Sequence, residues 1–71
     1  METEKLVKMA NQIGDFFEAN PDTEMAKKEI ANHLQRFWNS VMIKSIVAHV
    51  KQQHGAGLHP RVLDAIQQHL T

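Results

Sequence analysis

Residues that start or stop helices divide this chain into four short amphipathic segments. The interruptions are Asn20-Pro21, Asn39-Ser40 and the run from Gly55 to Pro60. A residue before proline avoids the helical region, proline is tolerated in the first helical position, and glycine accepts the left-handed conformation at a helix end. Between these points apolar residues recur at spacings of three and four, which is typical of helices with one buried face. We therefore predict helices over residues 3–19, 21–37, 40–53 and 60–70.

The same residues predict how the helices begin and end. Asn20 is the expected N-cap of the second helix, with Pro21 as its first residue, and His59-Pro60 repeats this arrangement for the fourth. Asn39-Ser40 is a turn and cap signal, and the glycines of Gly55-Ala-Gly57 are expected to end the third helix. The valines and isoleucines of that third segment leave a strand as the alternative. Helical spacing of its apolar residues favours a helix, with an inward face of Ile43, Ile46, Val47 and Val50.

These segments indicate an all-α fold, a small compact bundle of about four helices with short loops, in one domain over residues 1–71. Short loops further predict antiparallel neighbours. A core of this size rarely contributes more than about 3–5 kcal/mol, and the chain has no cysteine for a disulfide or a thiolate metal site. Small domains without such supports often gain stability from a partner, so association is a first expectation.

Charge and hydropathy exclude several classes of function. Eight basic residues balance eight acidic ones, which is not the basic footprint that nucleic-acid binding requires. The first residues are acidic and lack the apolar run of a secretory signal, and no apolar stretch is long enough to cross a membrane. A cytoplasmic protein that binds neither nucleic acid nor membrane is therefore expected. A helix-turn-helix interpretation of residues 21–53 is disfavoured because the third segment begins with Val41-Met42-Ile43, which cannot meet base edges.

No group of residues suggests catalysis or cofactor binding. A helical zinc site needs ligands one turn apart, and no two histidines are three or four residues apart. His54 and His59 could in principle close a loop on an ion, but solvated side chains near helix ends are the favoured interpretation of the histidines. The glycine run lacks the lysine of a phosphate loop, and no Ser-His-Asp arrangement is indicated. We expect no metal, no cofactor and no catalytic residue in this chain. The five histidines are His33, His49, His54, His59 and His69.

Two nine-residue blocks, Met9–Phe17 and Ile30–Trp38, each end in paired aromatics. Phe17 and Phe37 continue the apolar stripes and are expected in the core. Their neighbours Phe16 and Trp38 point about 100° away on a helix, so one or both are expected at its edge, where aromatics are enriched in interfaces. For Trp38, covering the core next to the turn is an equally good interpretation. Gly14 costs a helix about 1 kcal/mol relative to alanine, which indicates a close approach, either of another helix in this domain or of a partner's backbone.

These blocks also resemble one known family. Met9–Phe17, Asn20-Pro21-Asp22, Ile30–Trp38 and the Gly55–Pro60 connector together resemble the delta subunit of bacterial, molybdenum-containing, NAD-dependent formate dehydrogenase. The resemblance extends from about Leu6 to Leu70. Relatives usually carry an acidic residue, proline and arginine where this chain has Asn39, Ser40 and Val41, and a serine in place of His59.

The resemblance implies a non-catalytic accessory subunit that supports assembly, stability or cofactor maturation of a cytoplasmic dehydrogenase complex. In such complexes the alpha subunit carries molybdopterin and iron–sulfur clusters, the beta subunit FMN and the NAD site, and the gamma subunit a further iron–sulfur cluster. The alpha subunit is the expected partner. The alternative is a self-associating helical module, such as a homodimer, with no enzyme partner. The candidate partner-binding residues are Asn11, Gly14, Phe16, His33 and Trp38.

Overall fold

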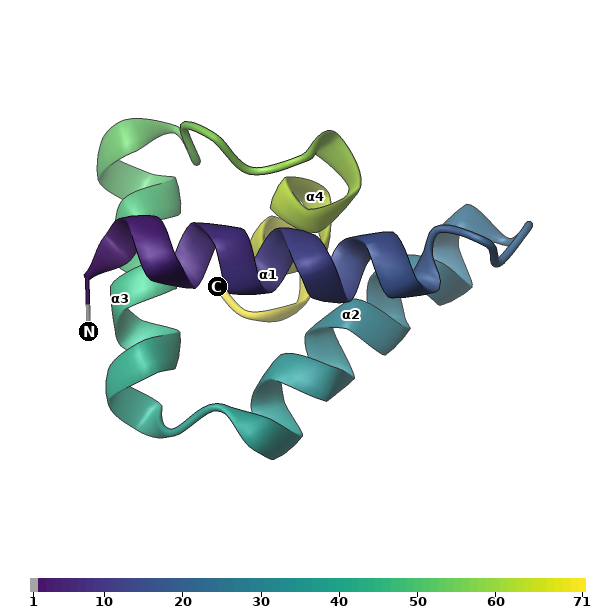
Figure 1. Ribbon diagram of the computed structural model, residues 1–71, viewed down its shortest axis with the longest axis horizontal. Helices are drawn as coiled ribbons and strands as arrows, with labels where there is room; N and C mark the ends of the chain where they lie inside the picture. Colours follow the sequence, from purple (N-terminus) through teal and green to yellow (C-terminus); the bar gives the residue numbers. More distant parts are fainter. Residues whose placement is uncertain (1) are drawn as a thin grey trace.

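The chain folds into four α-helices, as the computed structural model shows for residues 2–71 (Figure 1). Within these residues there is no strand, which confirms the all-α prediction and removes the strand alternative for the third segment. The molecule measures 31 × 22 × 19 Å. The helices are α1 (Thr3–Phe17), α2 (Thr23–Phe37), α3 (Ser40–Gln53) and α4 (Pro60–His69).

The apolar faces of all four helices meet in one core. Leu6, Ile30, Leu34, Ile46 and Ile66 are completely buried, and α2 has its most extensive contact with α4. One charged residue joins this interior: Lys27 is 8% exposed. Its ammonium lies 3.5 Å from carboxylate oxygens of Glu24 and Asp64, so that it ties α2 to α4. Burial of apolar side chains from every helix is the main stabilising contribution to the fold.

The helices are not arranged as a simple antiparallel bundle. α3 runs across α1 instead of alongside it, and α4 lies behind α1 (Figure 1). The expectation of antiparallel neighbours was therefore wrong for α3. The chain changes direction at Trp38, whose extended backbone (φ −90°, ψ 143°) ends α2 one residue before Asn39 caps α3.

One predicted cap and one predicted helix end differ from the observed ones. α2 begins at Thr23 rather than Pro21, because the side chain of Asp22, not that of Asn20, accepts a hydrogen bond from the backbone N–H of Met25 (3.1 Å). Asn20 instead accepts from the N–H of Asp22 (2.9 Å) and closes a turn before the helix. α1 ends at Phe17, two residues before the predicted end.

The other caps follow the sequence more closely. Asn39 accepts a hydrogen bond from the N–H of Met42 (2.9 Å), and Pro60 occupies the first turn of α4 after His59. The left-handed end of α3 comes one residue earlier than expected, at His54 (φ 56°), and Gly55 continues it (φ 69°). Histidine can adopt this conformation at modest cost, and the glycine after it removes any further penalty.

Candidate functional site

An apolar groove of about 550 Å³ opens where α3 turns away from α1 and α2. Its polar lining residues are Gln12 and His33, and no carboxylate or lysine lines it. Such a surface favours apolar contacts over the binding of ions. We call this surface the aromatic groove; its residues are Met9, Gln12, Ile13, Phe16, Phe17, His33, Phe37, Trp38 and Met42.

Four rings form a continuous row along one side of the aromatic groove. Phe16 and Phe17 meet edge to face with ring centroids 5.0 Å apart. Phe17 lies 6.1 Å from His33, and His33 lies 4.7 Å from Phe37. The row links the end of α1 to the end of α2, and it holds the exposed rings in defined positions through offset and edge contacts.

The two phenylalanines at the ends of this row face solvent. Phe16 is 77% exposed and Phe37 is 67% exposed, the largest fractions among the exposed large apolar side chains. The guanidinium of Arg36 covers part of the Phe37 ring at 5.8 Å from its centroid. Covering these rings with a partner would therefore be favourable. Burial of exposed apolar side chains is how interface residues contribute to binding.

The prediction of a core position was wrong for Phe37, whereas for Trp38 the structure supports the interpretation in which it covers the core next to the turn. Phe37 does lie on the apolar side of α2, but that side faces the open groove at this end of the helix and no other element covers it. Trp38 has left the helix, so helical geometry no longer sets its direction, and it is only 8% exposed. Trp38 forms part of the wall of the aromatic groove, and Phe37, like Phe16, is an exposed ring of it.

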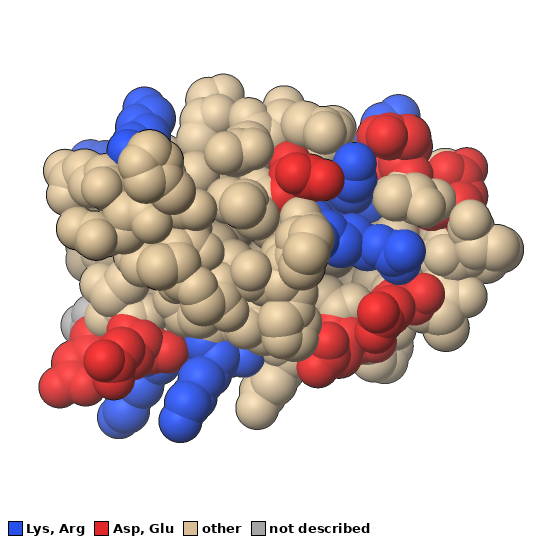
Figure 2. Space-filling model, turned by 90° about the horizontal axis from the view of Figure 1, so that it is seen from above, with Lys and Arg blue, Asp and Glu red and all other residues tan. Residues whose placement is uncertain are grey.

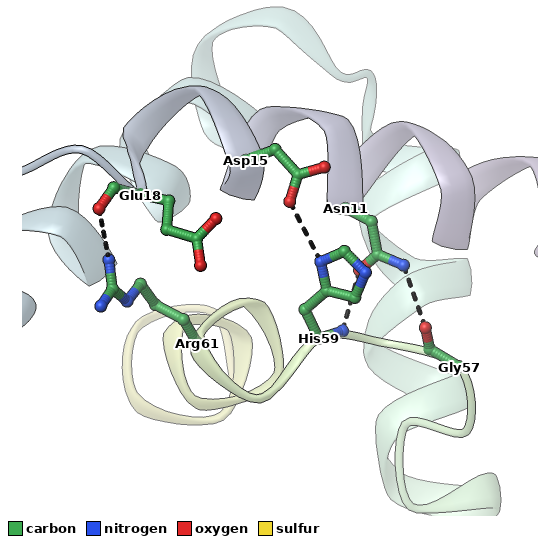
Figure 3. A network of polar contacts seen from close by, with 6 residues as sticks. All are labelled: Asn11, Asp15, Glu18, Gly57, His59 and Arg61. Carbon is green, nitrogen blue, oxygen red and sulfur yellow. Dashed lines mark hydrogen bonds and ion pairs between the residues drawn. The ribbon is translucent and has the colours of Figure 1, made fainter.

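Asn11 lies outside the aromatic groove and binds the connector between α3 and α4 (Figure 3). Its amide Nδ2 donates to the carbonyl of Gly57 (2.9 Å), and its Oδ1 accepts from the N–H of His59 (2.9 Å). His59 Nδ1 lies 3.2 Å from Asp15 Oδ1, and Arg61 donates to the carbonyl of Glu18 (3.2 Å). These contacts attach one side of α1 to the start of α4.

Gly14 is buried where α1 crosses α4. A Cβ built at this position would overlap Val62 Cγ2, and Ile30 Cδ1 would lie 4.0 Å from it. Of the two interpretations of this glycine, the crossing within the domain is the one that the packing supports. Its backbone is covered by this chain's own residues.

The structure thus brings together three of the five candidate partner-binding residues, Phe16, His33 and Trp38, in the aromatic groove. Asn11 and Gly14 face α4 and its connector instead. Sequence reasoning missed Phe37 and Met42 as groove residues. The helical spacing of Phe37 predicted a position in the core. No local signal in the sequence indicated where α3 turns away from α1 and α2.

The histidines are dispersed over the fold. His33 belongs to the aromatic row, His49 Nε2 lies 2.8 Å from the carbonyl of Ala56, and His59 faces Asp15. Over residues 2–71, no three side chains of the metal-binding types converge on a common point. Nor does any helix within that range have the length and apolarity needed to cross a membrane.

The fold and its surface define a small all-α protein with an apolar groove beside which two phenylalanine rings protrude. Residues 5–66 match the family model of the NADH-dependent formate dehydrogenase delta subunit, FdsD, and the chain belongs to this family. The resemblance drawn from the two aromatic blocks is thereby confirmed, and the family is one of subunits of a formate dehydrogenase complex. No curated protein and no solved structure gives a significant match.

Proposed function

We propose that this chain is a non-catalytic accessory subunit that binds the catalytic alpha subunit of an NADH-dependent formate dehydrogenase through the aromatic groove. By this contact it supports assembly, stability or cofactor maturation of that subunit in the cytoplasm. In this proposal molybdopterin, the iron–sulfur clusters, FMN and NAD belong to the other subunits. The observation that carries the proposal is the exposure of Phe16 and Phe37 beside an apolar groove in a member of this family.

Leaving these two rings in water costs free energy. Complete burial of one phenylalanine side chain contributes roughly 1.5–3 kcal/mol, so covering two largely exposed rings supplies part of the favourable free energy that must exceed the cost of association. The remainder would come from filling the groove between Met9 and Met42, whose flexible thioethers adapt to an inserted side chain.

The test compares two double variants in cells that lack the wild-type chain and express a tagged alpha subunit. Phe16→Ala with Phe37→Ala removes the exposed rings of the groove. Met25→Ala with Val41→Ala is the matched control, because these residues are 47% and 66% exposed but do not line the groove. The readouts are the amount of this chain that co-purifies with the alpha subunit, formate-dependent NAD reduction, and the molybdenum content of the enzyme.

We expect the groove variant to weaken association at least about tenfold, since interface aromatics typically cost more than 1 kcal/mol each on truncation to alanine. Activity and molybdenum content fall with it, while the control variant behaves as the wild type. Circular dichroism of both purified variants establishes that they remain helical. Unchanged co-purification and activity of the groove variant would contradict the proposal.

A second candidate function is self-association, favoured by the presence of protruding rings and an apolar groove on the same surface, which two copies could exchange about a twofold axis. Analytical ultracentrifugation of the purified chain distinguishes the two. A stable homodimer that Phe16→Ala with Phe37→Ala converts to monomer favours self-association. A monomer that binds the alpha subunit favours the accessory role.

A further inference from the structure

Acidic and basic residues are unevenly distributed along this neutral chain. Seven of the eight acidic residues precede Ile30, and the eighth is Asp64. Between Glu29 and Asp64 there is no carboxylate side chain, although this stretch contains four lysines and arginines. α3 lies wholly within this stretch, so its lysines have no acidic residue on their own helix.

A hollow of about 370 Å³ lies along α3, between its exposed lysines and partly buried aliphatic residues that pack against the edge of the core. Lys44 and Lys51 border it, and the aliphatic side chains of Ile43, Val47 and Leu70 contribute to its lining. In residues 2–71 the ion pairs involve Lys27 and His59, and neither Lys44 nor Lys51 lies within ion-pairing distance of a carboxylate. We call this surface the α3 outer face.

The space-filling view shows the same asymmetry. Red and blue side chains lie next to one another at the right and at the lower left of Figure 2. At the upper left, on the side that α3 occupies in Figure 1, blue side chains have no red neighbours. Basic side chains thus have acidic neighbours elsewhere on this view but not there.

The spacing of Lys44 and Lys51 suits contact with another α-helix. They are seven residues apart, which places them on the same side of α3 and about 10 Å apart along its axis. Val47 lies between them in sequence and is partly buried. A pair of ammonium groups two helical turns apart, with an aliphatic strip beside them, is complementary to a helix that carries two carboxylates at the same spacing next to its own apolar residues.

We propose that the α3 outer face is a second docking surface, and that its partner is an acidic amphipathic helix of another subunit of the dehydrogenase complex. A protein helix fits better than nucleic acid or a lipid surface, because two cations around an aliphatic hollow supply apolar contact and only a small attraction for phosphate groups. This inference rests on the proposed function, since it assigns a further contact to the same complex.

The position of the α3 outer face relative to the aromatic groove indicates what a second contact would contribute to the complex. Met42, which lines the aromatic groove, and Lys44 are two residues apart on α3 and therefore point about 200° apart around its axis. The aromatic groove and the α3 outer face thus lie on opposite sides of one helix. Through both, the subunit bridges two segments of the complex, one bound by apolar burial and the other steered by charge.

The experiment measures binding of the full chain to the dehydrogenase complex purified from cells that lack it, at several salt concentrations. The test variant is Lys44→Glu with Lys51→Glu. The matched control is Lys8→Glu with Lys28→Glu, which makes the same change in net charge at exposed positions of α1 and α2. A third variant, Lys44→Gln with Lys51→Gln, removes the charges without reversing them.

We expect the reversed variant to bind about tenfold more weakly at low salt, the neutral variant to lie between it and the wild type, and the control to bind as the wild type does. The salt dependence of binding decreases in the neutral variant. Equal binding of the reversed variant and the control would overturn this inference and leave the proposed function intact. A wild-type chain that does not bind the complex at all would overturn both.

Phosphatidylserine-containing vesicles provide the remaining comparison. If the wild-type chain binds them and the reversed variant does not, the α3 outer face belongs to a membrane surface, and the proposed helix partner is wrong. Absence of vesicle binding, together with weaker binding of the reversed variant to the complex, supports the protein partner.

Discussion

Gly14 lets α1 approach α4 more closely than any residue with a side chain would allow. Val62 Cγ2 occupies the space in which a Cβ would lie, and Val62 itself is completely buried. Glycine in a helix costs about 1 kcal/mol relative to alanine. Contact between the two helices offsets this cost, because interiors of proteins are packed too densely to leave such a space empty.

Gly14→Ala is therefore expected to destabilise the chain despite its better helix propensity. Overpacking of a core by one methyl group costs about 1–3 kcal/mol, against which the helix gains about 1 kcal/mol. The same substitution in a Val62→Ala background, where the added methyl group has room, is expected to be neutral or stabilising. Urea unfolding of the four chains measures this coupling, and simple additivity of the two substitutions would show that the crossing is not the reason for the glycine.

At the scale of helices, Asn11 joins two elements that are distant in sequence. One side chain both donates to and accepts from the backbone of the α3–α4 connector, at Gly57 and His59. Connectors carry backbone groups that no helix satisfies, and an asparagine amide can pair with one carbonyl and one N–H at the same time. This fixes where α4 begins relative to α1, and so also supports the burial of Val62.

Asn11→Ala is expected to destabilise the chain by about 1–2 kcal/mol, because two backbone groups lose their partner. Amide hydrogen exchange of His59 is expected to accelerate most. Asn11→Asp retains the acceptor for His59 but places a carboxylate against the carbonyl of Gly57, so it should preserve the slow exchange of His59 better than alanine does. Asn32→Ala, at an exposed position of α2, is the control; if it has the same effect on His59, the connector does not depend on Asn11.

At the scale of the whole molecule, all four helices contribute to one core, and no buried side-chain polar atom in residues 2–71 lacks a hydrogen-bond partner. A core of this size leaves a small margin of stability, while the aromatic groove keeps further apolar surface in water. Binding of a partner to the folded chain alone would raise its stability by mass action.

We expect the chain to unfold in a single cooperative transition, as one domain, with a free energy of unfolding of about 3–5 kcal/mol. Trp38 is the only tryptophan and is 8% exposed, so its fluorescence reports on tertiary packing, whereas far-ultraviolet circular dichroism reports on the helices. The two urea transitions should coincide. Separate midpoints would show that part of the helical structure survives loss of the core, and would contradict a single domain.

Local signals in the sequence predicted the helices, because proline, glycine and capping residues act within a few residues of their own position. Errors at the start of α2 and the end of α1 were of two residues, at positions where neighbouring side chains compete to cap. The family resemblance likewise depended on contiguous blocks. One or both of Phe16 and Trp38 were expected at the edge of the core, and Phe16, which lies beside the apolar stripe of α1, is the exposed one.

What the sequence determined by itself was the number, type and approximate bounds of the helices. The tertiary structure decided which residues of those helices face solvent. Phe37 has the spacing of a core residue but lies where α3 has turned away, and Trp38 is buried because the chain leaves α2 at that residue. Crossing angles and the contacts of Asn11 and Gly14 arise from the packing of distant segments, which the periodicity of a single helix does not encode.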